Sequence, residues 1–328
     1  MSVQEDLSII IPVWNLPEDL AVLLGQIADL GVFSEIIVAD DASDLECHPE
    51  ALGFSQDRLG ARLIYLRSDR QRGAGHARNM GLAAATSGNI LFFDADDHLS
   101  ENFPIIWRQH LAAGMPDFTI FRHSDTRVEE SEGRQGTFPS EEALWDRALD
   151  KNNAVEMLSI AAQAALCTIS AYPWNKIYRH DFLTDAGITC SETPVHNDIR
   201  LHWLSFARAN HIQASRLIGA THIVGERTHH LTSRKGAERL CLRSILSDLT
   251  QEIRNTPGKS ILIPEFIHFV DNVSRWNLQQ VDEDLIPEFT RLAIDAYLDF
   301  TPDEFRLFAH SRPDRADAIV RFLLKEGA

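Results

Sequence analysis

Residues 7–13 form an almost continuous apolar run, which only Ser8 and Pro12 interrupt. A run of this kind is typical of a strand that is buried on both faces, as strands are in a parallel sheet covered by helices. Residues 17–30 follow with apolar side chains at helical spacing, and Gly31 supplies a helix C-cap. The chain therefore opens with the strand and the helix of a β-α-β unit.

The same alternation of strand and helix continues as far as residue 121. The patterns predict strands at residues 35–39, 63–66, 90–93 and 117–121, and a helix at residues 73–85. This order predicts an α/β fold with a doubly wound, mostly parallel sheet, whose ligands bind at the carboxyl ends of the strands. Acidic clusters stand at two of these ends, at residues 40–41 and 94–97.

Strand patterns stop near residue 225. Beyond it, apolar residues recur at the spacing of amphipathic helices. We therefore predict two parts, an α/β domain at residues 1–225 and a helical C-terminal region at residues 226–328. Residues 124–142 are polar, charged and glycine-bearing, and we expect a long surface loop there.

The formal net charge of the chain is −17. Nucleic acid and anionic membrane surfaces repel such a charge on average, so we expect no nucleic-acid partner. No apolar run approaches the roughly twenty residues of a membrane-spanning helix. We expect no transmembrane segment, while peripheral contact with a membrane stays open.

The four cysteines are widely spaced and form no Cys-x-x-Cys pair. This spacing predicts free thiols in a reducing compartment rather than a disulfide framework or a zinc site. The N-terminus is polar and runs directly into the first strand, which leaves no room for a signal peptide. These features together predict a cytoplasmic protein.

Two loops at the carboxyl ends of neighbouring strands carry the first candidate site. Pro12, Trp14 and Asn15 end the first strand, and Asp40 and Asp41 end the second. An aromatic face stacks on a nucleobase, and a carboxylate accepts the N–H of a base imide. The structural alternative is that Trp14 covers the edge of the sheet and the Asp pair makes a turn.

A glycine-rich segment, residues 73–81, carries the second candidate site. Its glycines admit a close backbone approach, and the N-terminus of its helix favours anions. Arg78 can pair with a base carbonyl or with a phosphate. The segment lacks the Gly-Lys-Ser/Thr of a Walker A loop, and it does not follow a strand as a dinucleotide-binding fingerprint does.

The acidic residues Asp94, Asp96 and Asp97 form the third candidate site. In an extended segment, residues two apart point to the same side, so Asp94 and Asp96 can converge on a hard cation with diphosphate oxygens as further ligands. Carboxylates that are buried together without a cation repel one another. The alternative is a solvated acidic turn.

Four stretches resemble, in order and spacing, those of inverting family 2 glycosyltransferases, which have the GT-A fold. They are residues 8–15, 35–43, 72–81 and 88–97. A further stretch, residues 174–179 followed by Asp198 at the start of a predicted helix, resembles the acceptor half of these enzymes. The resemblance covers residues 7–212.

The resemblance implies roles in nucleotide binding. Trp14 takes the position of the aromatic residue that stacks on the base, in the same loop as Pro12 and Asn15. Asp41, together with Asp40, would contact uracil.

The resemblance also implies roles for Arg78 and for the acidic turn. Arg78 would assist in binding the base, and Asp94 would approach the ribose. Asp94 and Asp96 are the expected metal ligands, for Mn²⁺ or Mg²⁺. Some members of the family add a C-terminal histidine to the metal shell. The histidines to consider are His196, His222, His229 and His230, and an ordinary surface role stays open for each.

The catalytic base of the family is the Asp of a Glu-Asp pair, and the corresponding pair here is Asn197-Asp198. Direct displacement at an anomeric carbon needs a carboxylate that takes the proton of the attacking hydroxyl on the face opposite the leaving diphosphate. Asp198 is the residue that the resemblance assigns to this task. Its structural alternative is an acid in the first turn of a helix, with Asn197 as the N-cap.

Together these features predict transfer of one sugar, with inversion, from a nucleotide-sugar to a polysaccharide or lipid-linked acceptor. The expected donor is a UDP-sugar. Two alternatives stay open: a catalytically silent nucleotide-sugar-binding module on the same fold, and a sugar nucleotidyltransferase. The nucleotidyltransferase needs a glycine-rich loop directly after the first strand, where this chain has Pro12, Trp14 and Asn15.

Overall fold

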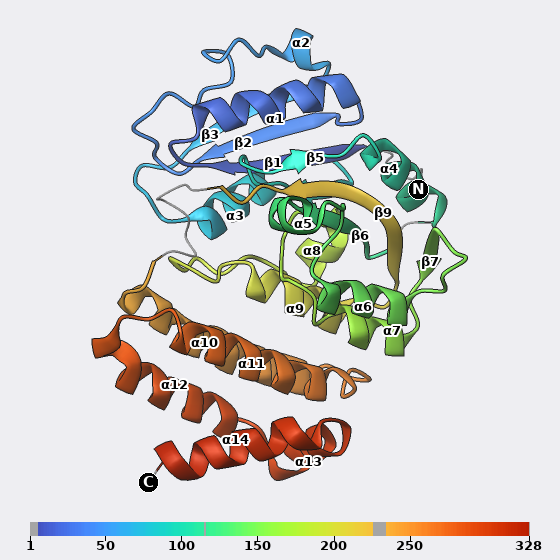
Figure 1. The fold of residues 1–328 in the computed structure, drawn as a ribbon. Coiled ribbons are helices and arrows are strands. Elements are labelled where there is room, and N and C mark those ends of the chain that lie inside the picture. Colours follow the sequence, from blue (N-terminus) through green and yellow to red (C-terminus); the bar gives the residue numbers. More distant parts are fainter. Residues whose placement is uncertain (1–5, 115, 226–233, 328) are drawn as a thin grey trace.

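The computed structural model describes residues 6–114, 116–225 and 234–327. Its centre is a nine-stranded sheet with helices on both faces, and a further group of helices stacks below the sheet in Figure 1. Within the described ranges, no helix is long and apolar enough to cross a membrane.

The first half of the sheet consists of four parallel strands in the order β3-β2-β1-β4. The predicted strands of this half and its two predicted helices are confirmed, whereas a third, short helix at Gln56–Leu59 was not predicted. The strands are β1 (Leu7–Val13), β2 (Glu35–Asp40), β3 (Arg62–Arg67) and β4 (Asn89–Phe92), and the helices are α1 (Pro17–Leu30), α2 (Gln56–Leu59) and α3 (Ala74–Ala84).

The second half of the sheet is mixed. Strand β8 (Lys176–Arg179) runs antiparallel between β4 and β6 (Phe118–Asp125), and β6 runs parallel to the long β9 (Ile212–His222). Two short strands, β5 (His98–Leu99) and β7 (Val155–Met157), pair antiparallel with β9. The helices of this half are α4 (Phe103–Ala112), α7 (Ile160–Leu166), α8 (His180–Asp185) and α9 (Ile199–Arg208).

Strand β1 is buried on both faces, as its apolar run predicted. Ile9 and Ile11 pack in one apolar cluster with Leu24 of α1, and Ile10 packs in the other with Leu82 of α3. Every residue of the strand is buried. Packing on both faces fixes the position of the strand and of the loop that follows it.

The prediction of a long surface loop at residues 124–142 was wrong. The segment contains the end of β6 and the helices α5 (Thr126–Glu132) and α6 (Pro139–Ala148). The side chain of Asp125 caps α5 by accepting the backbone N–H of Arg127, at 2.9 Å. Each helix buries only a few side chains, such as Val128 and Trp145, so their polar outer faces dominate the sequence pattern.

The C-terminal helices share the core of the α/β part. They are α10 (Leu242–Asn255), α11 (Leu262–Leu278), α12 (Ile286–Leu298), α13 (Pro302–Ser311) and α14 (Pro313–Glu326), with 3₁₀ turns at Ala237–Cys241 and Glu283–Leu285. Phe206 of α9, Leu246 of α10 and Phe266 of α11 belong to one continuous apolar cluster. The predicted boundary at residue 225 therefore lies between segments whose side chains pack together.

The close packing of α3 on β1 gives a test of the fold. A Cβ atom at Gly81 would overlap Cγ2 of the fully buried Ile10. We expect Gly81→Ala to lower the free energy of unfolding by about 1–3 kcal/mol, the usual cost of overpacking a core. Urea unfolding of the variant and the parent measures the change.

The matched control is Gly25→Ala in α1, where no atom lies within 4 Å of the added Cβ. Alanine is favoured over glycine inside a helix by up to about 1 kcal/mol, so this variant should be at least as stable as the parent. Equal stability of the two variants would contradict the packing described for α3.

Candidate active site

The candidate loops meet where neighbouring parallel strands end. Val13 of β1 is in register with Asp40 of β2, and Ile10 of β1 with Phe92 of β4. The segments that follow these three strands therefore emerge side by side from the same edge of the sheet. This edge is the predicted location of ligand binding in such a sheet.

Asn15 joins the first two loops to each other. Its backbone adopts the left-handed conformation, with φ of 54°, and its N–H donates to Oγ of Ser43 at 2.9 Å. Its side-chain oxygen accepts the backbone N–H groups of Asp44 and Leu45 at 2.7 and 3.0 Å. The neighbouring Trp14 is half-buried beside this joint. Asn15 thus fixes the position from which Trp14 would meet a ligand.

Asp40 lies inside a buried polar network. One of its carboxylate oxygens accepts the backbone N–H of Ser43, at 2.8 Å. The other accepts from the hydroxyl of Tyr65 and from Nη1 of Arg67, the latter at 2.8 Å. Burial and this hydrogen bond to Asp40 raise the pKa of Tyr65 to about 12, so the phenol stays a donor. The side chain of Asp40 is fully buried, and these bonds organise the turn after β2.

Asp41 fixes the segment that precedes α3. Its two carboxylate oxygens accept the backbone N–H groups of Arg72 and Gly73, at 2.8 and 2.6 Å. The glycine-rich segment is thereby tied to the end of β2. Each oxygen still has a second lone pair.

Arg78 of α3 is the centre of the candidate site. Its buried guanidinium forms an ion pair with Asp94 after β4, and its Nη1 donates to the side-chain oxygen of Asn197 at 2.6 Å. Burial acts to lower the pKa of Arg78, but the charge and hydrogen bond of Asp94, together with other nearby acidic groups, outweigh it, so the pKa lies above its usual range. The side chain is therefore a permanent cation that joins three segments.

The pair Asn197-Asp198 lies directly against this cation. The amide of Asn197 supplies the neutral acceptor that Arg78 uses. Asp198 occupies the N-cap position of α9 but makes no side-chain capping bond, so the structure does not support a capping role. Burial raises the pKa of Asp198, opposed by the charge of Arg78 and reinforced by that of Asp94.

The loop of residues 190–197, which we call the base loop, docks closely on α3. The side chain of Asn79 donates to the backbone oxygen of Cys190 at 3.0 Å and accepts its N–H at 2.9 Å. A Cβ atom at Gly75 would overlap the backbone oxygen of Ser191. The glycine is required here because backbone approaches backbone.

A second contact holds the base loop from the C-terminal side. His196 has a left-handed backbone, with φ of 59°, and its Nε2 lies 3.1 Å from the side-chain oxygen of Asn277 in α11. Arg239 donates to the same oxygen at 2.6 Å and lies 4.8 Å from the ring centre of Trp276. Burial lowers the pKa of His196 to about 4, so its ring is neutral near pH 7. We call His196, Asn277 and Arg239 the clasp.

The clasp could not be recognised in the sequence, although His196 was among the histidines considered. Asn277 and Arg239 lie in helical or 3₁₀ segments with no motif around them, and only the contacts across the fold reveal their role.

The acidic turn after β4 is divided between two partners. Asp94 pairs with Arg78, whereas Asp97 accepts from the backbone N–H of Ile223 and contacts Nδ1 of His222, both at 2.9 Å. Burial acts to lower the pKa of His222, but Asp97 outweighs it and raises the pKa above its usual value. His222 therefore supports Asp97, while His229 and His230 lie outside the described residues.

The carboxylates of this turn suit a metal whose other ligands come from a bound nucleotide. Within the described ranges, no three His, Cys, Asp or Glu side chains gather as a metal cluster. Mg²⁺ sites that bind nucleotides commonly use one or two carboxylates together with phosphate oxygens. The half-buried Asp94 and Asp96 offer such a pair of carboxylates.

Comparison with known proteins identifies the class. The model of the family "Glycosyl transferase family 2" matches residues 8–166. The structure of S. aureus TarS 1-349 in complex with UDP-GlcNAc is similar, with a TM-score of 0.75 and 18% identity, over 98% of this chain and 89% of that one. A mannosyltransferase, PcManGT from Pyrobaculum calidifontis in complex with GDP-Man and Mn²⁺, gives a TM-score of 0.54 and 16% identity, over 98% and 85%.

No curated protein sequence matches the chain. At these low identities the structural likeness shows the fold, and the family match covers the loops after β1, β2 and β4 but not the base loop. The chain has the GT-A fold of these glycosyltransferases, and its residues 8–166 match the model of glycosyl transferase family 2.

The clasp gives a second test. Asn277→Ala removes the acceptor that the buried Arg239 and His196 share. A buried donor left without its partner costs about 1–3 kcal/mol, so we expect a loss of free energy of unfolding in this range. Urea unfolding measures the loss, and Asn210→Ala, at an exposed position, is the control. Equal stability of the two variants would contradict the clasp.

Proposed function

We propose that the protein transfers one sugar from a nucleotide-sugar, with a UDP-sugar as the expected donor, to a glycan or lipid-linked acceptor with inversion at the anomeric carbon. The observation that carries this proposal is the position of Arg78, which contacts Asp94 of the expected donor site and Asn197 beside the expected base. Donor and acceptor residues thus share one cation.

The nucleotide would bind across the loops after β1 and β2. Trp14 would stack on the base, held in place by the neighbouring Pro12 and Asn15. Asp41 is a better candidate than Asp40 for the base imide, because each oxygen of Asp41 accepts a single backbone N–H, whereas one oxygen of Asp40 accepts from both Tyr65 and Arg67. The UDP-GlcNAc in the similar structure of TarS supports a UDP-sugar as donor, whereas the GDP-Man in PcManGT shows that this fold also accepts guanine.

The diphosphate would lie above Asp94 and Asp96. These residues would hold Mn²⁺ or Mg²⁺ together with the phosphate oxygens, and the ion pair with Arg78 would keep the carboxylate of Asp94 oriented. When bound, the cation would stabilise the negative charge that develops on the leaving diphosphate.

Asp198 would act as the base on the acceptor side. The acceptor hydroxyl oxygen attacks the anomeric carbon, its proton passes to a carboxylate oxygen of Asp198, and the bond from that carbon to the diphosphate oxygen breaks. A base works best when its pKa lies near the operating pH, and the raised pKa of Asp198 moves it in that direction. The charge of Arg78 opposes the shift and favours the ionised carboxylate that a base needs.

The silent binding module remains the alternative from another class, and it shares every donor residue named above. The two differ in turnover alone, which the second experiment below measures.

The first experiment concerns the metal. Diphosphate and carboxylates repel one another unless a cation lies between them. We expect calorimetry to show UDP binding in the presence of Mn²⁺ and little or none in EDTA. Asp96→Ala should abolish the metal-dependent part of the affinity, whereas Asp185→Ala, an exposed carboxylate at the end of α8, should leave it unchanged. Equal affinity for UDP with Mn²⁺ and with EDTA would refute the metal role.

The second experiment concerns the base. Asp198→Asn keeps the shape of the side chain but cannot accept a proton, so we expect turnover to fall at least about 10²-fold while UDP affinity stays unchanged. In the parent, turnover should decline as the pH falls through the raised pKa of Asp198, that is, above the usual aspartate range, and the variant should lose this decline.

Near-normal turnover in a folded Asp198→Asn variant would place the base elsewhere. Glu192, which lies on the same loop and pairs with Arg72 and His76, would be the next carboxylate to test. A parent that binds UDP but shows no turnover with any acceptor would favour the silent module.

A further inference from the structure

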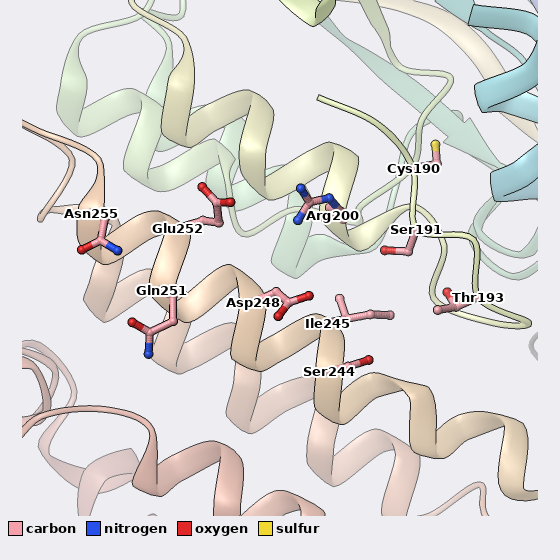
Figure 2. Close-up of a pocket in the computed structure, with 10 residues that line it drawn as sticks. All are labelled: Cys190, Ser191, Thr193, Arg200, Ser244, Ile245, Asp248, Gln251, Glu252 and Asn255. Carbon is pink, nitrogen blue, oxygen red and sulfur yellow. The ribbon is translucent and has the colours of Figure 1, made fainter. Parts of the chain in front are cut away.

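A cavity of about 600 Å³ lies between the base loop, the start of α9 and the helix α10 (Figure 2). Its volume falls within the roughly 300–1,000 Å³ that is usual for small-molecule sites. One wall is the base loop itself, and the facing wall comes from the C-terminal helices. The cavity is separate from the donor loops at the edge of the sheet.

The cavity presents polar side chains that lack partners. Arg200 of α9 and three residues of α10, Asp248, Gln251 and Asn255, make no side-chain hydrogen bond or ion pair with any other residue in the described part of the chain. Glu252 differs, because it accepts from Arg208 at 2.6 Å. Figure 2 shows Arg200 on α9 and the other side chains along α10, where Asp248, Gln251 and Asn255 are exposed.

The chemistry of the walls favours a neutral ligand with many hydroxyl groups. Asp248 disfavours an anion and Arg200 disfavours a cation, while the charge of Glu252 is already compensated. Carboxylate, guanidinium and amide groups together both accept and donate hydrogen bonds, as each sugar hydroxyl does. Ile245 is the one large aliphatic side chain among the lining residues, which leaves little surface for a lipid chain.

The cavity adjoins the candidate active site through Cys190. This residue lines the cavity, and its buried side chain lies close enough to Arg78 and Asp198 for their charges to affect it. Arg200, which lines the cavity from α9, follows Asp198 by two positions along the chain. A ligand in the cavity would therefore contact the segments that carry Asn197 and Asp198.

We propose that this cavity binds a neutral saccharide unit of the acceptor glycan, adjacent to the sugar whose hydroxyl faces Asp198. The assignment rests on the proposed function and specifies its acceptor: an oligosaccharide with an uncharged segment, rather than a monosaccharide or a bare lipid. Binding there would hold the acceptor through hydrogen bonds without stacking, since no aromatic side chain lines the cavity within the described residues.

The test is binding of the full chain to an array of defined neutral and anionic oligosaccharides, followed by calorimetry with the best neutral member. We expect the parent to bind neutral members, and Asp248→Ala and Gln251→Ala each to weaken that binding, for Asp248→Ala about tenfold or more. The matched control is Asp295→Ala, which removes an exposed carboxylate from α12, away from the cavity. It should bind like the parent.

Three outcomes would overturn the proposal: no array member binds the parent, only anionic members bind it, or the α10 variants bind neutral members as well as the parent does. Thermal melting of each variant shows that it is folded. UDP affinity, measured on the same samples, separates the two proposals. If the parent does not bind UDP, the proposed function is refuted. If the variants bind oligosaccharides as the parent does, only the proposal for the cavity is refuted.

Discussion

A single buried cation holds the candidate site together. The guanidinium of Arg78 is removed from water, which costs several kcal/mol unless good partners compensate for the lost hydration. Asp94 supplies the opposite charge and Asn197 supplies a neutral acceptor, from a segment 119 positions away in the chain. Loss of any one of the three would leave a polar group unpaired in the interior. The turn after β4 and the base loop are therefore energetically dependent on each other.

The parallel half of the fold could be predicted from the sequence because its signals are local. Strand β1 is apolar throughout since both faces are covered, and helix α1 shows its buried stripe at regular spacing. Helices α5 and α6 escaped prediction for the opposite reason. Each buries few side chains, so polar outer faces made the segment resemble a loop.

The candidate site was predictable only in part. The order of the strands implied that the loops containing Trp14, Asp41 and Asp94 would meet, and the structure brings them to one edge. The network around Asp40 was not foreseeable, because Tyr65 and Arg67 come from a neighbouring strand with no motif of their own. The departure at Asn197 also gains a physical reason only in three dimensions, as the acceptor for Arg78.

The clasp has a consequence for how such proteins diverge. The family match ends at residue 166, whereas Asp198 and its support at Asn277 lie beyond it. A recombination event that exchanged only the matched segment between relatives would transfer the donor loops without the base loop or the helix that restrains it. The segment that matches the family model thus does not contain the whole candidate site. Changes in donor choice and in the C-terminal helices would have to accumulate together, as compensating substitutions across the clasp and the Arg78 contacts.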